Sequence, residues 1–224
     1  MIPWQRIDSA GVPGSEQTLH LYRRGDEYSI RGDGFELMNS RLHGSEKALA
    51  QIALRVLGRC SGLHILIGGL GMGFTLAAAL GELDADSRVT MVELVPEVVR
   101  WNRGPLADLA GRPLADRRVA VREADVVEIL KTADAQYDAI ILDVDNGPDG
   151  LTRGGNDRLY DRQGLRSALS ALRCRGVLAV WSASPDAAFA ERLRRAGFRV
   201  EQRIVAARGR RRGGRHAIWL AIRD

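Results

Sequence analysis

The sequence has little lysine, little cysteine and no long apolar run. Lysine occurs only at Lys47 and Lys131, so arginine carries nearly all of the positive charge of this chain of 224 residues. Two cysteines, Cys60 and Cys174, are too few for a disulfide framework, and we expect both to be small, buried or partly buried thiols. No apolar stretch reaches the length that a membrane-spanning helix needs, so a membrane partner is not expected.

A secretion signal is also missing. The first residues, MIPWQRIDSAG, lack a charged and then apolar pattern, and we therefore expect a cytoplasmic protein. The net charge of +5 is moderate, but arginines concentrate in RGRRRGGR, Arg208–Arg215. Arginine pairs well with phosphate, so this segment is a candidate nucleic-acid contact. A solvated loop between two strands is the favoured interpretation of the same pattern.

The first part of the chain predicts short antiparallel strands. Residues 18–38 alternate apolar and polar side chains and break at two Gly-containing turns, which indicates two or three strands. A helix follows, with Ser45 as a plausible N-cap and apolar residues at helical spacing. We therefore divide the chain into a small N-terminal β-hairpin region, 1–44, and a Rossmann-like nucleoside-binding transferase domain, 45–224.

From His64 onward, strands and helices alternate. The expected strands have little polar alternation, as in parallel strands covered on both faces. They are 63–68, 88–93, 118–123, 137–144 and 176–183, separated by helices at 72–83, 95–103, 126–132, 160–173 and 185–196. Two further strand-like runs end the chain as an antiparallel hairpin. The pattern predicts an α/β fold with a doubly wound, Rossmann-like seven-strand sheet of the class I methyltransferase type.

A glycine loop interrupts the first core strand, in HILIGGLGMGF. Gly69, Gly71 and Gly73 follow at alternate positions and open the next helix. In a doubly wound sheet, ligands bind outside the carboxyl ends of the strands, where glycines allow the backbone to turn tightly and approach the ligand. A glycine motif alone is a weak signal, because a tight turn without a ligand has the same residues.

The next two strand ends carry acids. Glu93 lies at the tip of the second strand, where a carboxylate can accept both hydroxyls of a ribose. Asp125 ends the third strand and suits an adenine amino group, with the amide of Val126 beside it. Asp125 can also serve as a helix N-cap. Together with the glycine loop, these residues predict an adenosine site.

The fourth strand ends in YDAIILDVDNGPDG, which places Asp143 and Asp145 at the same edge of the sheet. Two nearby carboxylates raise each other's pKa, and either can accept a proton or hold a cation. We expect them to face the 5′ substituent of the adenosine.

These segments resemble the spermidine synthase family, the polyamine aminopropyltransferases. The resemblance runs from about Phe35 to Asp224 and is carried by LIGGLGMG, VELVPEVV, EADVVEIL and YDAIILDVDNGPDG…LYDRQGLRSALSALRCRGVLAV. It implies that an aminopropyl group passes from decarboxylated S-adenosylmethionine to an amine or polyamine, with methylthioadenosine as the leaving group. It also implies a homodimer and no metal ion.

The resemblance assigns roles to single residues. Gly69, Gly71, Gly73 and Glu93 would hold the donor, and Asp125 would bind its adenine. Asp143 would act as base, Asp145 as a ligand of the substrate ammonium, and Tyr160 as a wall or hydrogen-bond donor. His43 and Glu46 fall where the family's first helix contributes polyamine-facing side chains, although His43 is equally consistent with a turn residue.

The glycine loop departs from the family pattern, GGGDGG. Counted from Gly68, the family's acid falls on Gly71, so a carboxylate that would bind the aminopropyl ammonium is missing. Ordinary S-adenosylmethionine therefore remains an alternative donor, and a methyltransferase acting on a small amine or on RNA remains an alternative function. A non-catalytic nucleoside-binding module is a third interpretation. The motif Trp101-Asn102-Arg103-Gly104 is unexplained; a cap of its helix or one side of the adenosine pocket would fit it.

Overall fold

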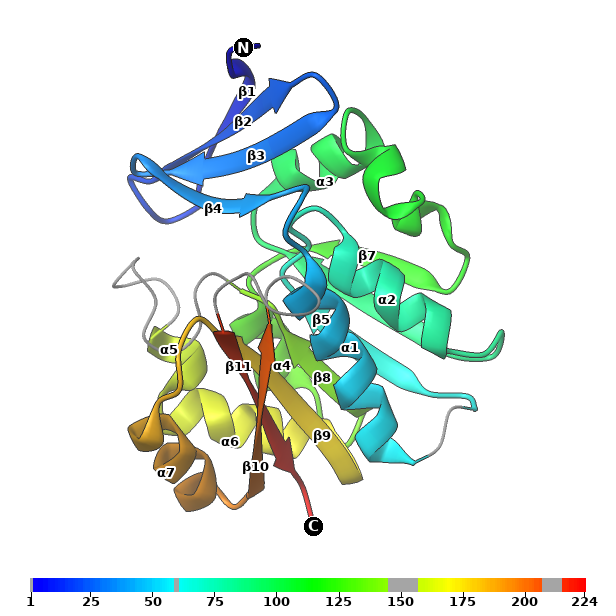
Figure 1. The fold of residues 1–224 in the computed structure, drawn as a ribbon. Helices are drawn as coiled ribbons and strands as arrows, with labels where there is room; N and C mark the ends of the chain where they lie inside the picture. Colours follow the sequence, from blue (N-terminus) through cyan, green and yellow to red (C-terminus); the bar gives the residue numbers. More distant parts are fainter. Residues whose placement is uncertain (1, 59–60, 145–156, 207–214) are drawn as a thin grey trace.

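A seven-stranded sheet forms the centre of the molecule (Figure 1). The computed structural model describes residues 2–58, 61–144, 157–206 and 215–224. The strand order is β10-β11-β9-β8-β5-β6-β7, in which β11 is antiparallel to both neighbours and the other pairs are parallel. The strands are β5 (His64–Gly68), β6 (Arg88–Glu93), β7 (Val119–Glu123), β8 (Tyr137–Leu142), β9 (Leu172–Ser182), β10 (Arg199–Ala206) and β11 (Arg215–Ile222). This sheet confirms the predicted fold class.

Helices cover both faces of this sheet, as expected for strands that are apolar throughout. One face packs against α1 (Gly44–Leu57), α2 (Phe74–Glu82) and α3 (Pro96–Arg103). The other packs against α4 (Val126–Thr132), α5 (Asp157–Tyr160), α6 (Arg162–Ala171) and α7 (Ala187–Ala196). The short 3-10 turns η1 (Ala107–Ala110) and η2 (Pro113–Ala115) follow α3.

Successive residues of a strand divide between the two cores. Ile65 and Ile67 of β5 belong to the cluster under α1 and α2, whereas Leu66 belongs to the cluster under α4 and α6. All three are fully buried. Side chains alternate across a strand, so a sheet sandwiched between helices needs apolar residues at every position.

The N-terminal region forms a four-stranded antiparallel sheet, rather than the expected two or three strands. Its strands are β1 (Gln5–Gly11), β2 (Thr18–Arg24), β3 (Glu27–Gly32) and β4 (Phe35–Asn39). The sequence did not indicate β1 because only Ala10 of this strand is buried, which leaves no apolar alternation. Leu21 and Ile30 join the core cluster of α1 and α2, so the two sheets share one core.

Three local predictions need correction. The helix expected at 160–173 is split at Asp161, which caps α6 by accepting a hydrogen bond from Gly164 N (2.7 Å). Helix α1 starts two residues earlier than expected, with His43 rather than Ser45 at the N-cap. Cys174 is exposed within β9, not buried, and Cys60 lies outside the described residues.

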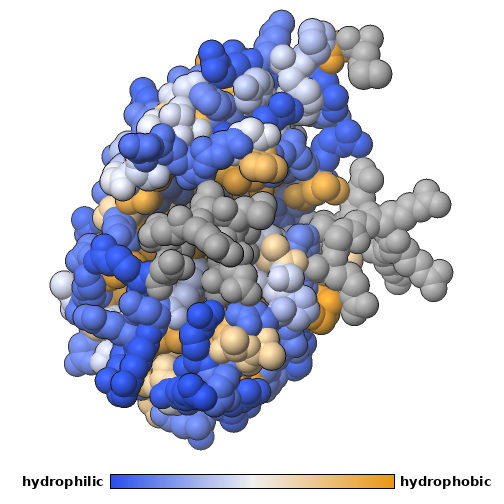
Figure 2. Space-filling view, turned by 90° about the vertical axis from the view of Figure 1, so that its left-hand side faces the viewer, coloured by the Kyte–Doolittle hydropathy of each residue, from blue (hydrophilic) through white to orange (hydrophobic). Residues whose placement is uncertain are grey.

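The surface is mostly hydrophilic in the face that Figure 2 shows, with small hydrophobic patches between charged side chains. None of the helices in the described ranges is both long and apolar enough to cross a membrane. In the same ranges, no cluster of His, Cys, Asp and Glu has the arrangement of a metal site.

Candidate active site

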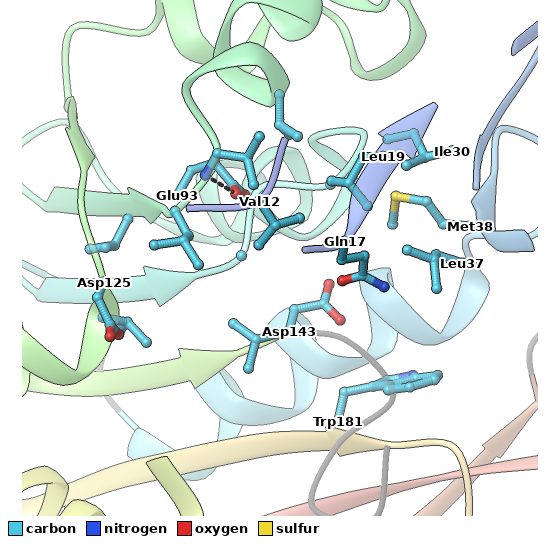
Figure 3. Close-up of a pocket in the computed structure, with 18 of the residues that line it drawn as sticks. Val12, Gln17, Leu19, Ile30, Leu37, Met38, Glu93, Asp125, Asp143 and Trp181 are labelled. Atoms are coloured by element: carbon cyan, nitrogen blue, oxygen red, sulfur yellow. Dashed lines mark hydrogen bonds between the residues drawn. The ribbon is translucent and has the colours of Figure 1, made fainter. Parts of the chain in front are cut away.

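A cavity of about 200 Å³ lies between the carboxyl ends of the central parallel strands and the N-terminal sheet (Figure 3). Both sheets contribute to its walls. The described lining residues are Val12, Gln17, Leu19, Ile30, Leu37, Met38, Glu46, Gly69, Gly71, Val92, Glu93, Leu94, Val95, Val98, Ala124, Asp125, Val126, Asp143, Val144 and Trp181. The cavity is therefore at the position where a doubly wound sheet binds ligands.

Gly69 lines the cavity where the ends of β5, β6 and β8 meet through backbone hydrogen bonds. Its N–H donates to Val92 O of β6 (2.9 Å), while Asp143 N, after β8, donates to Gly68 O of β5 (2.9 Å). A Cβ at Gly69 would lie 2.3 Å from Asp143 O, and the φ of Gly69 is +90°. Close approach and backbone conformation thus both require glycine at this position.

Gly71 lies against the N-terminal sheet. Its φ is +52°, and a Cβ there would lie 2.6 Å from Cε and 2.8 Å from Sδ of Met38 on β4. The place where a side chain of residue 71 would begin is therefore next to an apolar thioether. Gly73, with a φ of +81°, is the N-cap of α2 and does not line the cavity.

Glu93 is buried at the end of β6 and faces the cavity (Figure 3). Its Oε2 accepts a hydrogen bond from Leu70 N (2.8 Å) and its Oε1 from Val95 N (2.9 Å). The carboxylate therefore fixes the glycine loop and the turn before α3 relative to each other. A ribose contact of Glu93 stays a prediction.

Asp125 and Val126 also line the cavity, after β7. Asp125 is the N-cap of α4, and its Oδ1 accepts from Val127 N (2.8 Å). The role as N-cap that the sequence suggested is confirmed, and the residue contributes to the cavity wall as well. The structure thus brings the glycine loop, Glu93 and Asp125 to one cavity.

Asp143 is an acidic lining residue with a strongly raised pKa. Burial, and then the charge of Glu46, raise the pKa of Asp143 to about 7, while a hydrogen bond from the Thr75 hydroxyl to Oδ2 opposes this shift. Figure 3 shows its carboxylate pointing towards Gln17 of the N-terminal region. A carboxyl group with this pKa can exchange protons near neutral pH.

Glu46 is the acid on the α1 side of the cavity. It is buried, and its Oε2 accepts from the Ser45 hydroxyl (2.7 Å). Its charge also acts on Asp143, as the raised pKa shows. Two acids from distant parts of the chain therefore face the same small volume.

Other predicted site residues lie elsewhere. The ring of His43 stacks on Phe74, with centroids 4.0 Å apart, and does not line the cavity. Tyr160 is buried against Phe189 in the α4–α7 core, with ring centroids 5.5 Å apart, and it too is not a lining residue. Asp145 and residues 208–214 of the arginine-rich segment lie outside the described residues, as does the side chain of Arg215.

Four residues at or beside the cavity were not expected from the sequence: Gln17, Met38, Thr75 and Trp181. Trp181 is near the carboxyl end of β9, so the strand-end rule that found Glu93 could have found it too. Thr75 lies one residue into α2. Gln17 and Met38 come from the N-terminal sheet region, whose position over the cavity is a tertiary feature without a sequence signal.

Known proteins share sequence and fold with this chain. The model of the spermine/spermidine synthase domain matches residues 49–189. The polyamine aminopropyltransferase of Prochlorococcus marinus subsp. pastoris is 29% identical over 124 residues, which cover 55% of this chain and 42% of that protein. The chain thus matches less than half the length of this curated relative.

Solved structures show the same fold. The spermidine synthase of Thermotoga maritima superposes with a TM-score of 0.78 at 17% identity, over 100% of this chain and 75% of that one. A spermidine synthase in complex with the transition state analogue AdoDATO gives 0.77 at 18% identity, over 100% and 74%. With the family model matching more than half of its residues, the chain belongs to the spermine/spermidine synthase family.

Proposed function

We propose that this protein transfers an aminopropyl group from decarboxylated S-adenosylmethionine to an amine or polyamine acceptor. One observation supports a cationic donor and a cationic acceptor. Every charged side chain among the described lining residues is acidic: Glu46, Glu93, Asp125 and Asp143. The chain as a whole has a net charge of +5, so the cavity has the opposite sign to the molecule. Such a cavity favours cationic substrates.

The acidic lining also favours decarboxylated S-adenosylmethionine over S-adenosylmethionine as the donor. The carboxylate of S-adenosylmethionine would meet no Lys, Arg or His among the described lining residues. The charged groups of the decarboxylated form, a sulfonium and an ammonium, are both cationic. The comparisons give the methyltransferase alternative no support. A purely binding module would not need the base that Asp143 offers.

The proposed reaction is a single displacement. The lone pair of a neutral acceptor amine forms a C–N bond to the propyl carbon next to the sulfonium. The C–S bond breaks, and its electron pair stays on sulfur, which leaves neutral methylthioadenosine. The acceptor nitrogen loses a proton to Asp143, whose pKa of about 7 suits a general base. The cavity walls hold the reactants in line.

Glu46 offers the negative charge that the glycine loop lacks. Gly71 replaces the family's acid, and Met38 lies against it. Glu46, on α1, and Asp143, directly after β8, face the same cavity. We assign to this pair the attraction of a substrate ammonium. Asp145 remains a second candidate, and the dimer also remains a prediction.

Isothermal titration with three nucleosides tests the proposal. We expect decarboxylated S-adenosylmethionine and methylthioadenosine to bind at least about tenfold more tightly than S-adenosylmethionine, because a buried carboxylate without a partner is costly. A preference for S-adenosylmethionine would overturn the proposal. A binding preference as expected, followed by no aminopropyl product with any diamine in a mass-spectrometric assay, would also contradict it.

A further inference from the structure

Near its end, helix α3 carries two buried side chains whose polar groups contact the glycine loop and the first strand of the N-terminal sheet. Trp101 is 2% exposed and Asn102 is 3% exposed, and neither lines the cavity itself. Their hydrogen-bond partners are 93 and 31 residues away in the sequence. These two residues belong to the motif that the sequence left unexplained.

Asn102 holds the glycine loop. Its Nδ2 donates to Gly71 O (2.8 Å) and to Val98 O of its own helix (2.9 Å), so both amide N–H groups have carbonyl partners. Its Oδ1 lies 3.0 Å from where a Cβ on Gly73 would be. The side chain thus fixes the orientation of the Gly71 peptide and fills the space beside Gly73.

Trp101 holds the N-terminal sheet. Its Nε1 donates to Asp8 Oδ2 on β1 (2.7 Å), and this hydrogen bond is the main cause of the lowered pKa of Asp8. The other carboxylate oxygen, Oδ1, accepts from Ser9 N (2.8 Å). The β1–β2 register shifts between Arg6 and Asp8, and such an irregularity redirects side chains, here towards α3.

The two contacts join the two parts of the chain that bound the cavity, the glycine loop and the N-terminal sheet. The N-terminal sheet supplies Leu19, Ile30 and Met38 to the lining (Figure 3), and the glycine loop supplies Gly69 and Gly71. The width of the cavity therefore depends on the position of the N-terminal sheet relative to the glycine loop. Helix α3 contacts both the loop and the sheet, and its own Val98 lines the cavity.

We propose that Trp101 and Asn102 act as a clamp that sets this width. Asn102 is a positioning residue for the loop that receives the donor nucleoside, and Trp101, through Asp8, is a positioning residue for the sheet that bounds the acceptor. The assignment of donor and acceptor rests on the proposed function. The clamp itself rests on the hydrogen bonds and the burial of the two side chains.

The first experiment replaces Asn102. Asn102→Asp has nearly the same shape but no N–H group, so its carboxylate would face the two carbonyl oxygens of Gly71 and Val98. We expect the dissociation constant for methylthioadenosine to rise about tenfold or more, since hydrogen bonds are lost and a repulsion is added. Asn102→Ala removes the bonds without adding charge and should weaken binding less. In the folded Ala variant, the acceptor KM should change little.

The second experiment uses Trp101 and Asp8. Trp101→Phe and Asp8→Ala each remove the same hydrogen bond and should raise the acceptor KM about three- to tenfold. The double variant should be no worse than either single one, because the two residues act together. Asp8→Asn retains an oxygen acceptor and should keep the wild-type KM. Trp219→Phe, in a core strand where the indole N–H has no hydrogen-bond partner among the described atoms, is the matched control.

The outcomes separate the clamp from a merely structural role. If Trp101→Phe and Asp8→Ala lower the melting temperature and leave both KM values unchanged, as expected for Trp219→Phe, the clamp is wrong. It is also wrong if Asn102→Ala raises the acceptor KM and the dissociation constant of methylthioadenosine equally. A wild-type chain that neither binds methylthioadenosine nor transfers an aminopropyl group would instead refute the proposed function.

Discussion

Asp143 illustrates how neighbours change the chemistry of one carboxylate. Burial and the charge of Glu46 disfavour its ionised form, whereas the Thr75 hydroxyl stabilises it, and the net result is a pKa of about 7. An exposed aspartate ionises near pH 4 and would be a weak base. The value places Asp143 where a base is most effective at neutral pH.

Glu46→Gln should shift the pH dependence of the reaction. The substitution removes a negative charge near Asp143, so the pKa of Asp143 falls and the base stays ionised to lower pH. We expect the acid limb of kcat against pH, near pH 7 in the wild type, to move downward. The KM of the cationic substrate should rise. Glu191→Gln, the same change at an exposed side chain of α7, is the control. An unchanged limb would mean that Glu46 does not act on the base.

Asp143→Asn should remove the base and keep the binding site. We expect kcat to fall about 10²- to 10⁴-fold, the usual contribution of a general base. Affinity for methylthioadenosine should stay near the wild-type value, because Asn can still accept from Thr75. A variant with full kcat would show that another group takes the proton.

The same variant should alter the pH dependence of stability. Since the folded pKa of Asp143 is raised from 3.8 to about 7, the folded wild type binds more protons than the unfolded chain between these values, and its stability falls as pH rises through them. The asparagine side chain of the variant cannot ionise. We therefore expect melting temperatures that match near pH 4 and a variant that is a few degrees more stable at pH 8.

At the scale of elements, the glycine loop is determined by the strand ends that meet at it. Gly69 lies against the backbone of Asp143, which follows β8, and Leu70 N donates to Glu93, the last residue of β6. The loop conformation is thus a property of three strands and their register. A glycine motif in the sequence indicates only that the loop has no room for side chains at these positions.

Gly69→Ala tests this dependence. Its Cβ would lie 2.3 Å from Asp143 O at a positive φ, and we expect a loss of at least about 2 kcal/mol in the free energy of unfolding, with loss of methylthioadenosine binding. Gly81→Ala, in α2 with open space around it, should instead stabilise the protein by about 0.5–1 kcal/mol. Equal effects of the two substitutions in chemical denaturation would contradict the account.

At the scale of the whole molecule, the cavity exists because two sheets share a core. Leu21 and Ile30 of the N-terminal sheet pack in the same cluster as Leu49 of α1. This packing places Met38 and Gln17 over the carboxyl ends of β5 and β8. Neither sheet alone encloses a ligand, so both should respond when one binds.

Hydrogen exchange should detect this coupling. We expect methylthioadenosine to slow amide exchange in the glycine loop and also in β3 and β4, because Ile30 and Met38 line the cavity. Helix α7, on the opposite face of the sheet, serves as the internal reference. Protection confined to the glycine loop would show that the nucleoside does not reach the N-terminal sheet.

The sequence by itself determined the seven-strand sheet and the residues at its strand ends. Period and composition are local signals, and parallel strands bring their carboxyl ends to one edge, so Gly69, Glu93, Asp125 and Asp143 could be grouped without coordinates. Strand β1 was not predicted because it buries only Ala10 and so has no alternation of apolar and polar residues.

Only the tertiary structure decided what faces these residues. The proximity of Glu46 to Asp143, the thioether of Met38 over Gly71 and the two contacts of Trp101 and Asn102 each join segments far apart in the chain. Such contacts depend on how helices and the N-terminal sheet pack on the central sheet. Packing is a long-range property that no local pattern encodes, and it sets both the charge and the width of the cavity.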